Sequence, residues 1–107
     1  MSYDISFYSH QCNCGQGHDR VFDRNYTYNI AKIAKEAGFS VNDFDGKNGA
    51  EIVAILDPAI ERMNKNPDHF RQFNPPNGWG DFDSFVGLLE ILLAHCHEYP
   101  SGYCRIS

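Results

Sequence analysis

The sequence predicts an α+β domain in which a small antiparallel sheet carries about three helices on one face. Apolar and polar residues alternate at the N-terminus, apolar residues recur at helical spacing in three later segments, and a short segment suited to a strand follows Pro100 and Gly102. We therefore expect a sheet made of an N-terminal hairpin and a C-terminal strand. The 107 residues are enough for one core, so residues 1–107 are predicted to form a single domain.

The first strand of the hairpin is predicted from Tyr3, Ile5 and Phe7, which alternate with more polar neighbours as in a half-buried strand. Residues 12–18 contain two glycines and predict a turn, and residues 20–23 predict the returning strand. Because the sheet is short, its edge strands lack partners, which favours strand addition or dimerisation.

The first helix is expected directly after the hairpin, with Asn25 or Thr27 as its N-cap and Gly38 in a left-handed C-terminal cap. Residues 39–48 predict a loop that holds two aromatic side chains. The apolar stripe of this helix consists of Ile30, Ile33, Ala34 and Ala37.

The second helix carries Pro58 inside its apolar pattern, and proline lacks the backbone N–H group that a helix interior uses. Either one kinked helix continues past Pro58, or Asp57 caps a new helix with Pro58 in its first position. We favour the single helix. Residues 67–73 predict a short helical turn. The apolar stripe of the second helix consists of Ile52, Leu56, Ala59, Ile60 and Met63.

The last helix is expected to begin near Asp81 or Asp83, because a carboxylate stabilises the free N–H groups at a helix start. Leu88 and Ile91 widen its apolar stripe, which predicts a central position or burial in a homo-oligomer. Residues 103–107 predict the closing strand. The main stripe consists of Phe82, Phe85, Val86, Leu89, Leu92, Leu93 and Cys96.

The composition is acidic, with a net charge of −5 and a pI of about 5.4. Nucleic-acid binders use Lys and Arg to neutralise phosphates, so direct nucleic-acid binding is not expected. No run approaches the roughly 18 apolar residues of a membrane span, and the N-terminus lacks the pattern of a signal peptide. We therefore expect a cytoplasmic protein without a membrane partner.

Cysteine and histidine residues near the predicted turn allow a zinc site as an alternative. His10, Cys12, Cys14 and His18 supply ligands that zinc accepts in a tetrahedral site. The Cys-x-Cys spacing lacks the usual two-residue gap, however, and the sequence contains no Cys-x-x-Cys pair. We therefore expect no metal and no cofactor. Cys96 is interpreted as a small apolar core residue.

The sequence provides no catalytic set that can be assigned from spacing. Neither the phosphate-binding Gly-x-x-x-x-Gly-Lys-Ser/Thr pattern nor a Gly-x-Gly-x-x-Gly turn occurs. Several aspartates fall in predicted loops, where carboxylates are ordinarily solvated. We therefore do not expect an enzyme.

Two segments combine polar groups with an aromatic ring, and each is predicted to open a helix. Free N–H groups at a helix start suit a phosphate, aromatic faces stack on a base, and Asn side chains hydrogen-bond its edge. The alternative is that these residues only cap helices, form turns and cover the core. If both helix starts lie at one end of the sheet, they frame a ligand site made of Asn25, Tyr26, Thr27, Asn29, Asn77, Trp79 and Asp81.

The chain resembles a family of small, uncharacterised proteins encoded by bacteriophages and prophages. The resemblance rests on the opening strand at residues 3–6, the Asn-x-Thr-x-Asn pattern at 25–29 followed by Ala-Gly at 37–38, the Asn-Pro-x-Asn-Gly-Trp-Gly pattern at 74–80, and the closing residues 105–107. It covers nearly the whole chain and implies a phage origin, but it transfers no catalytic residue. The cysteines of the hairpin turn depart from the family pattern.

Small acidic phage proteins without catalytic residues often act by binding, frequently against a host defence system. We therefore expect a non-catalytic, anti-defence binding protein in the cytoplasm of the host bacterium. The first hypothesis is that it sequesters a small phosphorylated or nucleotide-like signal. The alternative is a protein–protein inhibitor of a host defence complex, whose acidic surface occupies a basic surface of a host protein. A homo-oligomer is compatible with either function.

Overall fold

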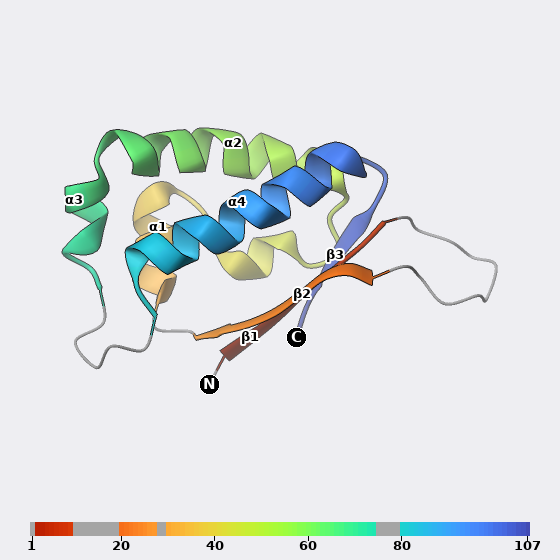
Figure 1. Ribbon diagram of the computed structural model, residues 1–107, viewed down its shortest axis with the longest axis horizontal. Coiled ribbons are helices and arrows are strands. Elements are labelled where there is room, and N and C mark those ends of the chain that lie inside the picture. The colour runs from red at the N-terminus through yellow and green to blue at the C-terminus, as the bar shows by residue number, and fades with distance from the viewer. Residues whose placement is uncertain (1, 10–19, 28–29, 75–79) are drawn as a thin grey trace.

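The computed structural model describes residues 2–9, 20–27, 30–74 and 80–107, and it has the predicted α+β fold (Figure 1). β1 (Ser2–Tyr8) lies between β2 (Arg20–Thr27) and β3 (Tyr103–Ile106), and both neighbours run antiparallel to it. The N-terminal hairpin and the C-terminal strand therefore form one sheet, as the sequence predicts. The helices lie on one face of this sheet (Figure 1).

Helical segments connect β2 to β3. They are α1 (Ala31–Ala37), the 3₁₀ helix η2 (Val41–Phe44), α2 (Gly49–Lys65), α3 (Pro67–Arg71) and α4 (Phe82–Glu98). The two long helices, α2 and α4, pack against each other (Figure 1). Within the described residues, no helix combines the length and the apolar character that a membrane span requires.

The helix ends follow local capping rules. Asn48 Oδ1 accepts a hydrogen bond from the Glu51 N–H group at 2.8 Å, and the Glu51 carboxylate accepts one from the Asn48 N–H group at 3.1 Å. α2 then continues through Pro58, so the prediction of one helix is confirmed and a separate helix capped by Asp57 is wrong. Gly38 ends α1 with a φ of 98°, the left-handed conformation expected there.

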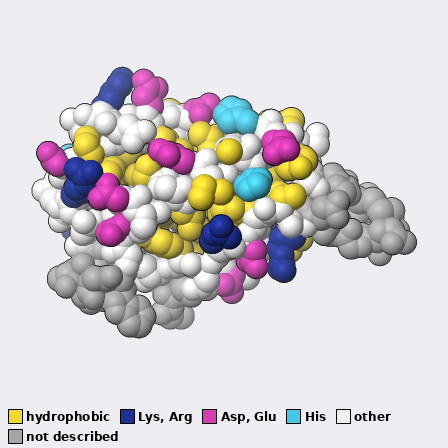
Figure 2. All heavy atoms as spheres, in the orientation of Figure 1, with side chains coloured by type: hydrophobic (Ala, Val, Ile, Leu, Met, Phe, Trp, Pro, Cys, Tyr) yellow, Lys and Arg dark blue, Asp and Glu magenta, His cyan; other side chains and the backbone are white. Residues whose placement is uncertain are grey.

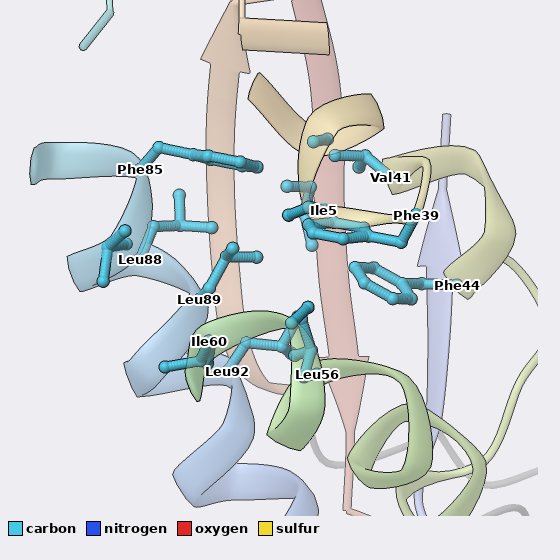
Figure 3. Close-up of a cluster of buried hydrophobic side chains, with 14 of the residues drawn as sticks. Ile5, Phe39, Val41, Phe44, Leu56, Ile60, Phe85, Leu88, Leu89 and Leu92 are labelled. Carbon is cyan, nitrogen blue, oxygen red and sulfur yellow. The ribbon is translucent and has the colours of Figure 1, made fainter. Parts of the chain in front are cut away.

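The core lies between the sheet and the helices. The Phe39 ring stacks on Phe44, with centroids 5.5 Å apart, and on Phe85, with centroids 6.3 Å apart. Residues 39–48 thus bury two aromatic side chains, as predicted, although part of this segment is the helix η2. Side chains from α2 and α4 point toward Ile5 of the central strand (Figure 3). These buried residues form a single hydrophobic cluster.

α4 occupies the central position that its wide apolar stripe predicts. Leu88 is buried together with most of the main stripe, and Leu93 is half-buried. Ile91 departs from the pattern because 46% of its surface is exposed, and it is the one large hydrophobic side chain classed as exposed in the described part of the chain. Burial of this residue in a homo-oligomer stays a prediction.

The segment after the hairpin differs from the prediction. Asn25 and Thr27 do not cap a helix but lie in β2, which is longer than the predicted 20–23 strand. α1 begins only at Ala31, and its N-cap residue Ile30 forms no side-chain capping bond. The reason is tertiary: residues 24–27 pair with β1, which overrides the local capping preference of Asn and Thr.

Candidate functional site

The face of the sheet that points away from the helices forms a hollow of about 640 Å³. Alternation along β1 explains its origin. Tyr3, Ile5 and Phe7 point into the core, so the side chains between them lie on the opposite face. We call this surface the sheet hollow; its lining residues are Asp4, Ser6, Tyr8, Arg20, Asp23, Tyr103, Arg105 and Ser107.

An aromatic pair forms one wall of the sheet hollow. Tyr8 lies opposite Tyr103 in the β1–β3 register, and their rings stack with centroids 4.9 Å apart and an angle of 14° between the planes. The backbone at Gly102 brings the two strands together, because a Cβ atom there would lie 2.8 Å from the Phe7 ring and would also meet the Tyr8 carbonyl oxygen. Both tyrosines are half-buried, so this part of the wall is held in place by its surroundings.

Arginine and aspartate residues line the rest of the sheet hollow. Arg20 Nη1 lies 3.7 Å from the Asp23 carboxylate, and Arg105 Nε lies 3.6 Å from the Asp45 carboxylate. These side chains are about half exposed, and exposed pairs of this kind contribute only about 0–1 kcal/mol. Each guanidinium group can therefore leave its carboxylate partner and bind an anionic ligand with little loss of free energy.

The structure brings together two of the residues predicted to form a ligand site, Tyr26 and Asp81. The Tyr26 hydroxyl donates to the Asp81 carbonyl oxygen at 3.2 Å and lies 2.5 Å from Ser84 Oγ. A Cβ atom at Gly80 would lie 2.6 Å from Thr27 Cγ2, so the end of β2 contacts the chain just before α4. The described residues of the two segments therefore lie side by side, and a shared ligand site between them stays a prediction.

Two of the N–H groups at the start of α4 already have partners from the protein itself. Asp81 Oδ1 accepts from the Ser84 N–H group at 2.7 Å, and Asn74 Oδ1 accepts from the Phe82 N–H group at 2.8 Å. These two groups are therefore not free to bind a phosphate, and the use of this helix start as a phosphate site stays a prediction. Asp81 instead acts as the N-cap, which is the structural alternative considered for it.

Asn25 lies on the other side of the sheet from Tyr26. Its Nδ2 group donates to Asp4 Oδ1 at 2.6 Å, and Asp4 lines the sheet hollow. Asn25 thus lies at the border of the sheet hollow and away from the start of α4. Asn29, Asn77 and Trp79 lie outside the described residues, and their part in a ligand site stays a prediction.

Asp81→Ala is expected to destabilise the protein by about 0.5–2 kcal/mol at neutral pH, because it removes the N-cap of α4. The hydrogen bond from the Ser84 backbone lowers the pKa of the Asp81 carboxyl below its ordinary value. The charged cap therefore contributes fully above about pH 4 and loses its contribution as the pH falls through the lowered pKa. Urea unfolding of both proteins at about pH 7 and pH 2.5 measures this. An equal difference in stability at both pH values would contradict a role for the charge.

The zinc alternative cannot be placed, because His10, Cys12, Cys14 and His18 all lie outside the described residues. In the described part of the chain, no three His, Cys, Asp or Glu side chains are grouped so that they could hold a metal ion. Two further cysteines, Cys96 and Cys104, are buried, unbridged members of the core, as expected for Cys96. Burial raises the pKa of each thiol to about 12, so neither is a reactive thiolate near neutral pH.

No protein-family model, curated protein or solved structure matches this chain. The geometry of the sheet hollow and the sequence are therefore what indicates a function. The sheet hollow was not predicted from the sequence, because its two tyrosines come from opposite ends of the chain. The available signal was the alternation of residues 3–8, which already places Ser6 and Tyr8 on the face opposite the core.

Proposed function

We propose that this protein is a non-catalytic binding protein that sequesters a small phosphorylated, nucleotide-like ligand in the sheet hollow. The observation that carries this proposal is the presence of a stacked tyrosine pair and two arginines in one concave surface. Its volume of about 640 Å³ falls within the roughly 300–1,000 Å³ of small-molecule sites.

The lining side chains supply a separate group for each part of such a ligand. The tyrosine wall offers an aromatic surface for a base, an interaction worth about 1–3 kcal/mol. Arg20 and Arg105 supply planar, charged donors that bind a phosphate in a bidentate manner. Asp4 and Asp23 supply acceptors for sugar hydroxyl or base amino groups. The equal numbers of arginine and aspartate favour a ligand that carries donors as well as negative charge.

The resemblance to phage-encoded proteins supports the biological setting of this proposal. A phage protein that removes a nucleotide-like signal from the host cytoplasm counteracts a defence system that depends on that signal. Stoichiometric binding is sufficient for this role, so no catalytic residue is required.

Arg105→Ala is expected to weaken binding by about 1.5–3 kcal/mol, because it removes a charge-assisted hydrogen bond to the ligand phosphate. Isothermal titration calorimetry with a panel of cyclic mono- and dinucleotides measures the effect. Lys65→Ala is the matched control, because it removes the same charge from an exposed position on α2 where Lys65 pairs with Glu61 at 3.1 Å. No heat with any nucleotide, or equal losses in the two variants, would contradict the proposal.

Inhibition of a host protein is a second candidate function, favoured by the exposed carboxylates on α2 and α4. Figure 2 shows acidic side chains spread around an apolar surface on this side of the molecule. A basic host protein captured from lysate and released by moderate salt would support this function over ligand sequestration. The exposed acidic residues of the two helices are Glu51, Asp57, Glu61, Asp83, Glu90 and Glu98.

A further inference from the structure

The two outer edges of the sheet differ in how their backbone groups are satisfied. At the β3 edge, the Cys104 N–H group donates to the Lys47 carbonyl oxygen at 2.9 Å, and the Cys104 carbonyl oxygen accepts from the Gly46 N–H group at 2.8 Å. The Ile106 N–H group donates to Asp45 Oδ1 at 2.9 Å. Residues 45–47 therefore occupy the outward-pointing backbone groups of β3, so a further strand cannot pair with this edge.

The register shows which backbone groups point outward at the β2 edge. Asp4 and Ser107 exchange both of their backbone hydrogen bonds, so the Asp4 groups point toward β3 and those of Ile5 point toward β2. Arg24, the partner of Ile5, therefore points its backbone groups toward β1, and the groups of Asp23 point away from the sheet. None of the described residues provides an acceptor for the Asp23 N–H group, and the Asp23 carbonyl oxygen accepts from the Arg24 guanidinium at 2.8 Å.

α4 lies beside this edge and provides an apolar surface next to it (Figure 1). A groove of about 240 Å³ separates them, lined by residues 20–24 of β2 and by Ile91 and His95 of α4. The Phe22 and His95 rings contact each other with centroids 5.8 Å apart. Ile91, exposed as described above, borders the groove, so an added strand would cover apolar surface as well as gain backbone hydrogen bonds.

The groove is basic on an acidic protein. It contains Arg20 and Arg24 against one acidic residue, Asp23, whereas the net charge of the whole chain is −5. The Arg24 guanidinium lies over the Phe22 ring, 5.4 Å from its centroid, and no carboxylate of the described residues forms an ion pair with it. Figure 2 shows basic side chains, with acidic ones beside them, where Figure 1 places β2, below the apolar surface.

We propose that the β2 edge binds an extended, acidic segment of a partner protein, which adds a fourth, antiparallel strand beside α4. The register defines the segment. Arg24 and Phe22 direct their backbone groups toward β1, so they would form non-hydrogen-bonded pairs with residues of an added strand. In such pairs the two opposing side chains, here on the core-side face, lie closest together. An acidic side chain opposite Arg24 and an apolar side chain two residues away, opposite Phe22 and near Ile91, complement the groove. Phe22, Arg24 and the α4 residues line only the groove, whereas Arg20 and Asp23 also line the sheet hollow.

The probe is a fluorescein-labelled nonapeptide with Thr at odd positions and Val at even positions, except for Glu at the fourth position. Fluorescence polarisation with the full chain is expected to show saturable binding. Arg24→Glu is expected to weaken it about tenfold, and a peptide with Lys in place of Glu is expected to restore the binding of that variant. A peptide with Pro at its third and fifth positions loses the N–H groups that pair with β2, and it is expected not to bind.

Amide hydrogen exchange locates the interaction on the protein. Saturating peptide is expected to slow exchange of the Asp23 amide about tenfold or more, because this group points outward and becomes hydrogen-bonded. The proposal is overturned if the wild-type chain does not bind the peptide, if the proline peptide binds equally well, or if Lys in the peptide fails to rescue Arg24→Glu. Self-association of the chain that protects Asp23 without peptide would also overturn it, because a second copy would then occupy the edge.

Discussion

Phe85→Ala is expected to destabilise the protein by about 3–5 kcal/mol, the largest effect of any single change considered for this fold. The Phe85 side chain is fully buried, and its ring contacts Tyr26, with centroids 5.8 Å apart, as well as Phe39. Its removal leaves a cavity where β2, α4 and the segment before η2 meet. Since small domains are stable by only about 5–15 kcal/mol, a large fraction of the total stability would be lost.

Urea unfolding followed by far-UV circular dichroism measures this change in the free energy of unfolding. Ile91→Ala on the same helix is the control, because this side chain is partly exposed and alanine favours the helix. We expect that control to change the stability by less than about 1 kcal/mol. Equal costs for the two substitutions would show that Phe85 is not part of a close-packed core.

Gly102→Ala is expected to cost about 1–3 kcal/mol through overpacking and to weaken ligand binding in the sheet hollow. The added methyl group would overlap the Tyr8 backbone and the Phe7 ring, so β3 has to move away from β1. That movement separates Tyr103 from Tyr8 and disrupts the aromatic wall. Urea unfolding and calorimetry with the nucleotide panel measure the two effects on one variant.

Gly87 provides the matched control for this prediction. It lies inside α4, and a Cβ atom there would meet nothing within 4 Å. Gly87→Ala is therefore expected to stabilise the protein by about 0.5–1 kcal/mol, because alanine loses less backbone entropy in a helix. If the two alanine substitutions changed the stability by the same amount and sign, the close approach at Gly102 would be refuted.

Periodic patterns predicted the larger elements of the fold correctly. The alternation of Tyr3, Ile5 and Phe7 identified both the strand and its buried face, and the apolar stripe of α4 identified the central helix. These predictions succeed because burial of one face imposes a period that is visible in the sequence itself. Asp81 was likewise predicted near a helix start from its local capping chemistry, and it caps α4.

The remaining features depend on contacts between distant parts of the chain. Asn25 and Thr27 have the chemistry of helix caps, but pairing with β1 draws them into β2. The side chain of Asn74, in the segment before α4, accepts a hydrogen bond from the Phe82 N–H group. No local capping rule predicts this bond. The sheet hollow exists only because β3 aligns Tyr103 with Tyr8, and strand register cannot be obtained from the residues of either strand alone.

The most direct test of ligand binding on the open side of the sheet is a ¹H–¹⁵N NMR titration of the full chain with the nucleotide that gives the strongest calorimetric signal. The structure predicts shifts at the amides of Ser6, Tyr8, Asp23, Tyr103 and Arg105, and little change at Ser84 and Phe85 near the start of α4. Shifts concentrated at the start of α4, with an unchanged spectrum for the sheet, would contradict this assignment.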